Sequence, residues 1–553
     1  MAWLLAIIAE AGIAGRIITM LSWKSTFLFL PLGLAMAQPH ALPAGEKPVA
    51  LYKGLGAWKH PIATRNPEAQ KFFDQGLSLL YGFNRYEALR SFRKAAELDP
   101  QAAMADWGMA MAQGPYINMD GDPSFDLKGA CAAVAAGKKL AQAPERERAY
   151  LQAVATWCPE FKPQAYADAM RAMAARYPDD PEALTIYAES LMIPVRWHWY
   201  AADGKPAAGV AEAEHTLEAV IRRWPQHPGA NHYYIHAVES SPTPERAIPS
   251  AQRLMGIVPW AGHMVHMPGH IWLVLGDWET AAGVNERAVA VDKEYFAATN
   301  VTAGTYAPYY LHNLDFIRYA RSMQGRKADA LRAAEEEASA AQPMIQAMPD
   351  MAETIFPVVL FTYVRFGEWD HVLKTPQPKA NQKMSTAAWR YARALALAAR
   401  GDRAGAARER EAFEAARKAV PAAMPWGQNQ AGPVLAMTSE IVAARVAGSP
   451  GEAVAHWQRA VAQQDALAYD EPPAWYYPLR ESLGAALLRA GQAAEAEKVF
   501  REGVKRSPHN GRMLFGLLES LKAQRKADDA AWVQREFDQV WAKADLKLRL
   551  EDL

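Results

Sequence analysis

The residues of this chain that could do chemistry are concentrated in one stretch. Seven of the 14 histidines lie between positions 227 and 312 of the 553-residue chain. They are His227, His232, His236, His263, His266, His270 and His312. Imidazole nitrogens are common ligands of zinc, copper and iron. The clustering therefore indicates either a transition-metal site or a group of hydrogen-bonded core histidines.

The spacing of four of these histidines is duplicated. His232 and His236 are four residues apart, and His266 and His270 repeat this pair 34 residues later. On a helix, each pair would project from one face, about 6 Å apart along the axis. Neighbouring helices pack about 8–10 Å apart, so inward-pointing imidazoles could share an ion. The spacing predicts a metal site, with duplicated packing histidines as the alternative.

The elements that would position these residues are helices, since helix-period patterns dominate and alternating strand patterns are nearly absent. Two stretches share one spacing of small, aromatic and proline residues: Gly76, Ala88, Phe92, Ala95 and Pro100, and Gly484, Ala496, Phe500, Gly503 and Pro508. This spacing resembles the tetratricopeptide repeat, a 34-residue helix–turn–helix unit. We therefore expect an all-α, tetratricopeptide-like solenoid of helical hairpins that forms a right-handed superhelix, with one solenoid over 66–345 and a second over 346–553.

Repeat register aligns the possible ligands. Ten positions before the inter-helix turns at Pro242, Gly276 and Gly325 stand His232, His266 and Asp315. The resemblance implies that such positions face a concave, ligand-binding groove. The predicted metal ligands are His232, His236, His263, His266, His270, His312 and Asp315, with Glu239 and Glu189 as supporting carboxylates. Pro268 should kink the helix that carries His266 and His270.

The N-terminus has the features of an export signal. Residues 20–37 contain a start-like Met20, the cationic Lys24, an apolar run and a small-x-small ending. We expect residues 1–37 to be a signal peptide with its true start at Met20, followed by an N-terminal extension over 38–65. A membrane anchor is the alternative, but no later stretch is apolar enough to span a bilayer. The predicted location is the periplasm or the exterior.

The two cysteines are Cys131 and Cys158, in two helical patterns separated by a break at Pro144. A helix hairpin that turns at Pro144 would bring them opposite each other, and export favours oxidation. We expect a disulfide, although two small buried hydrophobic side chains remain the alternative.

Four segments of the chain carry a closer resemblance: residues 60–92, HPGANHYYIHAVE, AGHMVHMPGHI and YYLHNLDF. They are similar to segments of a bacterial family of exported tetratricopeptide repeat proteins, which mostly lack an assigned activity. Relatives often have Ser where this chain has Gly269, and His where it has Asp315. Asp315 therefore favours a mixed nitrogen and oxygen site over an all-imidazole site.

Charge and motifs exclude several classes of function. The chain has 60 basic and 60 acidic residues, so bulk charge does not favour nucleic-acid binding. It has no nucleophile elbow, phosphate loop or dinucleotide fingerprint. Two hypotheses remain: a protein that binds zinc, copper or iron, with the open ion serving hydrolysis or oxidation, or an adaptor whose groove binds a peptide or partner protein.

Overall fold

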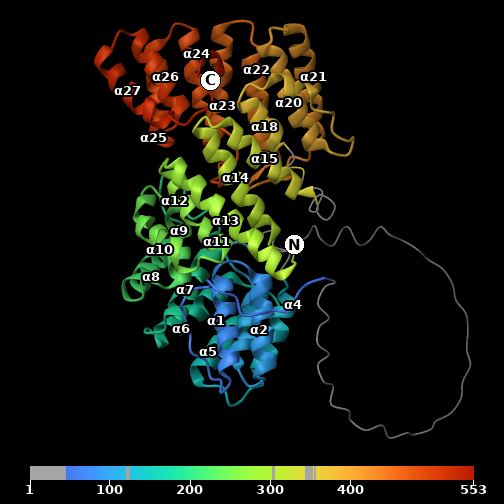
Figure 1. Ribbon diagram of the computed structural model, residues 1–553, viewed down its shortest axis with the longest axis vertical. Coiled ribbons are helices and arrows are strands. Elements are labelled where there is room, and N and C mark those ends of the chain that lie inside the picture. The colour runs from blue at the N-terminus through green and yellow to red at the C-terminus, as the bar shows by residue number, and fades with distance from the viewer. Residues whose placement is uncertain (1–44, 120–124, 302–305, 343–352, 354–356) are drawn as a thin grey trace, which may run out of the picture. The chain divides into compact units, whose positions relative to one another are not determined.

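The computed structural model describes residues 45–119, 125–301, 306–342, 353 and 357–553. The predicted signal peptide lies outside this described part, as does the expected boundary at 345/346. Residues 45–553 form one compact unit. It is an all-α assembly of tetratricopeptide-like helical hairpins, in which α8–α14 lie between α1–α6 and α18–α27 (Figure 1).

The first fifteen α-helices run to residue 340. They are Pro67–Tyr81 (α1), Arg85–Leu98 (α2), Ala103–Gln113 (α3), Leu127–Gly137 (α4), Glu145–Val154 (α5), Pro163–Arg176 (α6), Pro181–Met192 (α7), Val210–Arg223 (α8), Pro228–Glu239 (α9), Ile248–Ile257 (α10), Gly262–His266 (α11), Pro268–Val274 (α12), Trp278–Thr299 (α13), Ala307–Met323 (α14) and Lys327–Ala340 (α15).

The α-helices described over residues 357–553 are Val358–Arg365 (α18), Trp369–Lys374 (α19), Lys383–Ala399 (α20), Arg403–Ala419 (α21), Ala431–Arg445 (α22), Pro450–Asp465 (α23), Arg480–Arg489 (α24), Ala493–Arg506 (α25), Gly511–Ala523 (α26) and Ala527–Val540 (α27). Short 3-10 helices are Ala155–Trp157 (η1), Ile193–Val195 (η2), Pro244–Ala247 (η3) and Leu550–Asp552 (η4). Two strands, Pro425–Trp426 (β1) and Asn429–Gln430 (β2), pair antiparallel, with Pro425 opposite Gln430.

The repeated glycines and phenylalanines hold successive hairpins together. A Cβ atom on Gly76 would lie 2.6 Å from the Phe92 ring, and one on Gly108 would lie 2.4 Å from it. Phe500 occupies the same place between Gly484 and Gly516, where the corresponding distances are 2.4 and 2.1 Å. One aromatic ring therefore fills the space between two helices that only glycine allows to approach so closely. This confirms the packing role that the sequence spacing predicts.

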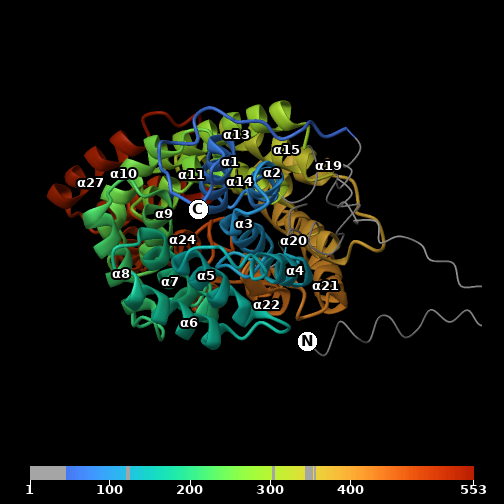
Figure 2. The same ribbon diagram turned by 90° about the horizontal axis from the view of Figure 1, so that it is seen from below.

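The predicted turns fall where helices end. Gly276 (φ 75°) follows α12 and Gly325 (φ 70°) follows α14, and both have a left-handed backbone that glycine adopts at little cost. Seen from below, helices α9 and α11 lie side by side and α14 lies next to α11 (Figure 2).

The described unit has two large hydrophobic cores. One contains buried side chains from Leu55 to Tyr309, and the other contains side chains from Leu273 to Leu553. Helix α12 belongs to both, because Ile271 packs in the first core and Leu273 in the second. The helix that carries His270 therefore lies where the two cores meet.

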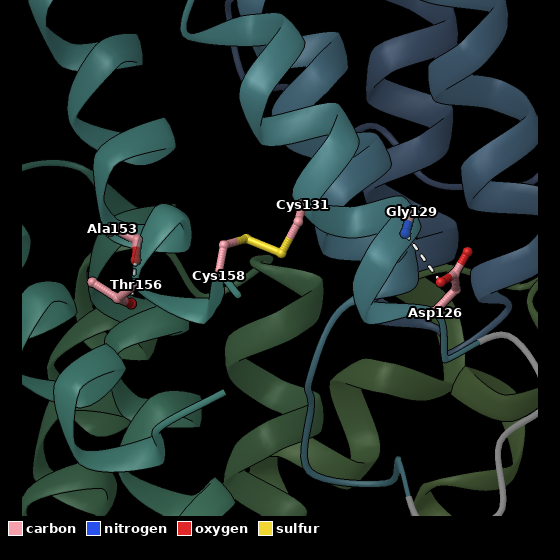
Figure 3. The surroundings of a disulfide bond; sticks show 6 residues. All are labelled: Asp126, Gly129, Cys131, Ala153, Thr156 and Cys158. Atoms are coloured by element: carbon pink, nitrogen blue, oxygen red, sulfur yellow. Dashed lines mark hydrogen bonds between the residues drawn. A yellow bond between two sulfur atoms is a disulfide. The ribbon is translucent and has the colours of Figure 1, made fainter. Parts of the chain in front are cut away.

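The predicted disulfide is present. Cys131 of α4 and Cys158, which follows η1, are bonded with their Cα atoms 5.7 Å apart (Figure 3). Helix α4 ends at Gly137 and α5 begins after Pro144, so the chain turns where the sequence predicts. Asp126 caps α4 by accepting a 3.0 Å hydrogen bond from the Gly129 amide.

None of the helices in the described ranges is both long enough and apolar enough to cross a bilayer.

Candidate metal centre

Four helices place the predicted histidines in one buried region. Helix α9 carries His232 and His236, α11 carries His263 and His266, α12 carries His270, and α14 carries His312. Helix α11 ends at His266 and α12 begins at Pro268, as expected from a proline that removes one backbone donor. His232 and His266 have no exposed surface, and His312 is the one member that is half-buried.

The six histidines form two groups, which we call the first and the second triad. The first triad is His232, His236 and His263, and the second is His266, His270 and His312. Within each triad, one ligand atom from each residue lies within 4.8 Å of the others. The triads adjoin, since the rings of His236 and His270 are 5.3 Å apart and those of His263 and His266 are 5.4 Å apart.

Hydrogen bonds orient two imidazoles of the first triad. The Nδ1 atom of His232 lies 2.5 Å from the Tyr81 carbonyl oxygen, and that of His236 lies 2.9 Å from Glu239 Oε1. Both partners only accept, so each Nδ1 carries the hydrogen and each Nε2 holds a lone pair. Both Nε2 atoms are buried without a hydrogen-bond partner, as are both nitrogens of His263. Buried imidazole nitrogens rarely stay unpaired, which makes this group unusual as a packing core.

The same orientation recurs in the second triad. His266 Nδ1 lies 2.6 Å from Asn285 Oδ1, while the Asn285 amide nitrogen donates to the Ala281 carbonyl. His266 therefore donates from Nδ1 and presents the Nε2 lone pair. A Cβ atom on Gly269 would lie 2.5 Å from Asn285 Nδ2, so a glycine at 269 leaves room for this partner.

His266 Nε2 and His270 Nε2 face each other at 2.6 Å. His266 and His270 both donate a hydrogen bond from Nδ1. If both rings were neutral, both Nε2 atoms would carry lone pairs, and the two lone pairs would repel each other. At this separation one of the two nitrogens carries a proton that the other accepts.

Two carboxylates support both triads. Glu239 accepts from the Nδ1 atoms of His236 and His270, and so connects the triads. Glu471, from the segment between α23 and α24, lies 2.7 Å from His270 Nδ1 and accepts from the Tyr469 hydroxyl. A carboxylate behind a ligating imidazole fixes its tautomer and raises its basicity. With His236 and His270 these carboxylates also form a compact mixed nitrogen and oxygen group.

The electrostatics keep five of the six imidazoles neutral. Burial, reinforced by neighbouring histidines, lowers the pKa of His236 to about 3 and that of His312 to about 4. The same causes hold the pKa values of His232, His263 and His266 well below the usual range. A metal ligand must be neutral imidazole, so these side chains are ready to bind without losing a proton.

His270 differs from the other five. Burial favours its neutral form, but the carboxylates of Glu471 and Glu239 raise its pKa to about 10. Without a metal ion, His270 is an imidazolium at neutral pH, and its Nε2 donates to His266. A metal ion at this position would replace that proton.

Aromatic rings enclose the triads. The Phe83 ring stacks on His263 at 4.9 Å and lies 4.5 Å from His232. Trp199, from the segment between η2 and α8, is buried with its ring 5.8 Å from His236. Phe316 lies 4.7, 5.1 and 4.9 Å from the rings of His266, His270 and His312. These rings bury the imidazoles in an apolar surrounding, which strengthens electrostatic interactions inside the site.

Two predicted residues lie elsewhere. Asp315 accepts a 2.8 Å hydrogen bond from Arg318 Nε and is not part of either triad, although its repeat position matches His232 and His266. Helix α14 turns this position toward Arg318, which also lies 3.9 Å from Glu337 of α15. Glu189 accepts from the Ile117 amide at 3.4 Å and contacts no histidine of the triads by a hydrogen bond recorded among the described residues. The carboxylates at the site are Glu239 and Glu471.

Sequence reasoning missed Glu471 and Asn285. Glu471 stands in the irregular segment 466–479, which has no repeat register to align it with the histidines. Asn285 lies on α13, whose histidine-free sequence gave no reason to inspect it. A buried polar residue opposite a glycine is the one signal that could have pointed to Asn285.

A cavity of about 320 Å³ adjoins the second triad. His270 and Glu471 form part of its wall, and most of the remaining wall is apolar or aromatic. Phe316 lines the cavity and also contacts all three histidines of the second triad.

Another group of histidines and carboxylates lies around α7. His60, Asp180 and Glu182 also have ligand atoms within 4.8 Å of one another. Here, however, Glu182 accepts from Trp58 Nε1 at 2.6 Å and from His60 at 2.7 Å, and Asp180 caps α7. We call these residues, together with His227, the Glu182 network.

Comparison with known proteins adds the following. No protein-family model matches the chain. An uncharacterized protein of Aquifex aeolicus (strain VF5) is 39% identical over 61 residues, which are 11% of this chain and 8% of that protein. The chain therefore spans less than a tenth of that relative's length.

The crystal structure of yeast Tom70 aligns with 87% of this chain and 92% of its own, with 10% identity and a TM-score of 0.29. The human IFIT1 dimer with m7Gppp-AAAA aligns with 88% and 92%, with 11% identity and a TM-score of 0.30.

Proposed function

We propose that the protein binds transition-metal ions through the two triads, one ion in each. The observation that carries this proposal is the common orientation of His232, His236, His266 and His270. Each donates from Nδ1 to a fixed acceptor and directs Nε2 into the cluster. The unpaired nitrogens of His232, His236 and His263 are costly in a metal-free core, and an ion would satisfy them.

Zinc, copper and iron all suit three imidazole ligands. An ion held by three side chains keeps a coordination position open, as in catalytic zinc sites, where bound water becomes a nucleophile near neutral pH. The open position supports a metal-dependent hydrolase or oxidoreductase. The disulfide and the predicted signal peptide support a periplasmic or secreted location, where disulfides persist.

Elemental analysis of the protein purified without a histidine tag tests this proposal. We expect about two equivalents of a transition metal per chain, and near-complete loss in the double variant His236→Ala/His270→Ala. His215→Ala is the matched control, because His215 is an exposed histidine on α8. Protein that stays empty after incubation with zinc, copper and iron would overturn the proposal.

A second candidate function, an adaptor that binds a peptide, is favoured by the way the C-terminal helices hold the backbone of η4 and the residue that follows it. Arg445 of α22, Arg489 of α24 and Arg512 of α26 each donate to a main-chain carbonyl of the segment 550–553. They line a cavity of about 850 Å³. If this surface binds a partner, changing Arg445 and Arg512 to Ala should abolish capture of that partner and leave the metal content unchanged.

A further inference from the structure

We infer that the 320 Å³ cavity beside His270 admits a small neutral molecule with an aromatic or apolar body, which reaches the ion of the second triad. This inference rests on the proposed metal site. It adds to that site the chemical class of the molecule that occupies the open coordination position.

The position of the cavity supports this assignment. Phe316 lines the cavity, and the centre of its ring lies 4.7–5.1 Å from the ring centres of the three histidines of the second triad. His270 and Glu471 belong to the cavity wall and to the histidine cluster alike. A molecule in the cavity would therefore have one end against His270, the one ligand of the second triad that lines it, and against the supporting carboxylate of Glu471.

The size and the walls define the body of the molecule. A volume of about 320 Å³ is at the small end of ligand pockets, which commonly measure about 300–1,000 Å³. Leu273, Phe316 and Trp475 are buried side chains that line it, and Val274 and Leu467 are half-buried ones. Such walls favour an aromatic ring or a short aliphatic chain.

The charges select against anions. The carboxylates of Asp470 and Glu471 both line the cavity, and each is held by hydrogen bonds. The cations that line it, Arg480 and Arg506, are both near Asp465, at 2.6 and 3.6 Å. Apart from the proposed ion, an anionic molecule would therefore meet two carboxylates, Asp470 and Glu471, that neither lining arginine offsets.

Cobalt-loaded protein and 4-phenylimidazole test this inference, because Co²⁺ reports coordination through its visible spectrum. We expect 4-phenylimidazole to change that spectrum and to bind at least about tenfold more tightly than imidazole, since the phenyl ring buries apolar surface. Benzoate, which has the same ring and a negative charge, should bind at least about tenfold more weakly than 4-phenylimidazole, because the carboxylates of the cavity oppose it.

Two substitutions that fill the cavity provide the control. Val274→Trp on α12 and Leu467→Trp on the opposite segment should each remove the tenfold preference for 4-phenylimidazole. Cobalt content and the weak response to imidazole should stay at the wild-type level. Using both variants guards against one of them failing to fold, which circular dichroism would reveal.

The outcomes separate the two proposals. Wild-type protein that takes up no cobalt would refute the metal site itself. Protein that binds cobalt but prefers neither probe, or prefers benzoate, would overturn the inference about the cavity and leave the metal site standing. An unchanged preference in both tryptophan variants would also overturn it, because the probe would then bind elsewhere.

Discussion

The histidine triads and the Glu182 network contain the same kinds of residue in equally buried places, but their nitrogens are used differently. In the Glu182 network, His227 accepts from the Ala230 amide with Nδ1 and places Nε2 3.5 Å from Glu182. Glu182 also accepts from Trp58 and His60. In the triads, the carboxylates accept hydrogen bonds only from Nδ1 atoms, those of His236 and His270, and none of them contacts an Nε2 atom. The Glu182 network leaves one buried imidazole nitrogen, His60 Nε2, without a hydrogen-bond partner, whereas the first triad leaves four such nitrogens close together. Several unpaired nitrogens that converge have room for a ligand.

The largest expected effect on stability lies in the Glu182 network. Glu182→Ala leaves His60, His227 and Trp58 without their shared acceptor, so we expect a loss of about 3–5 kcal/mol in the free energy of unfolding. Urea denaturation of metal-free protein measures this. Metal content should not change. Glu145→Ala, which breaks the exposed pair with Arg176, should cost less than about 1 kcal/mol and serves as the control.

In the triads, removing a supporting carboxylate should affect binding instead. Glu239→Gln replaces a carboxylate that accepts from both His236 and His270 with an amide whose single oxygen can accept from only one of them, so metal affinity should fall about 10–100-fold. Competition with a chelator of known affinity measures the change. An unchanged affinity would mean that Glu239 serves packing alone, and would make the triads resemble the Glu182 network.

A stabilising substitution sharpens the comparison further. His263 has two buried, unpaired nitrogens, so His263→Leu should stabilise the metal-free protein by about 1–3 kcal/mol. The same variant should lose one of the two metal ions. Stabilisation with loss of metal is the pattern of a binding residue, and destabilisation would show that His263 is a structural residue.

The smallest expected effect is a pH dependence. Burial opposes the charged forms of both His60 and Glu182. Even so, the Glu182 carboxylate raises the pKa of His60 above 6.5, and the hydrogen bonds from His227 and His60 hold the pKa of Glu182 below 4.5. The His60 contribution is complete below pH 6.5 and is lost as pH rises through its folded pKa. The Glu182 contribution is complete above pH 4.5 and is lost as pH falls. The difference in stability between wild type and Glu182→Gln should therefore be greatest between about pH 4.5 and 6.5, and denaturation midpoints across pH 3–9 test this.

Local patterns predicted much of this molecule. The spacing of Gly76 and Phe92 predicts how hairpins pack, and the duplicated pairs His232/His236 and His266/His270 predict which imidazoles converge. Both predictions concern contacts between neighbouring helices of regular repeats, and the period of such repeats can be read from the sequence.

What the sequence did not reveal depends on long-range contacts. Glu471 reaches His270 across 201 residues from an irregular segment, and no local pattern encodes that approach. Asp315 misled the prediction because equal repeat position does not imply equal side-chain direction. Arg318, one turn further along the same helix, forms a charge-assisted hydrogen bond with Asp315, and this local contact holds the carboxylate away from the triads.

The junction of the two hydrophobic cores at α12 has a consequence for how the chain is assembled. Glu471 belongs to the C-terminal half and His270 to the N-terminal half, so neither half contains the complete surroundings of the second triad. Two fragments divided within 343–352 would each lack part of it, and an ion bound there would add its binding free energy to their association. Metal-dependent reassembly of such fragments would make the histidine cluster a reporter of whether the two halves have come together.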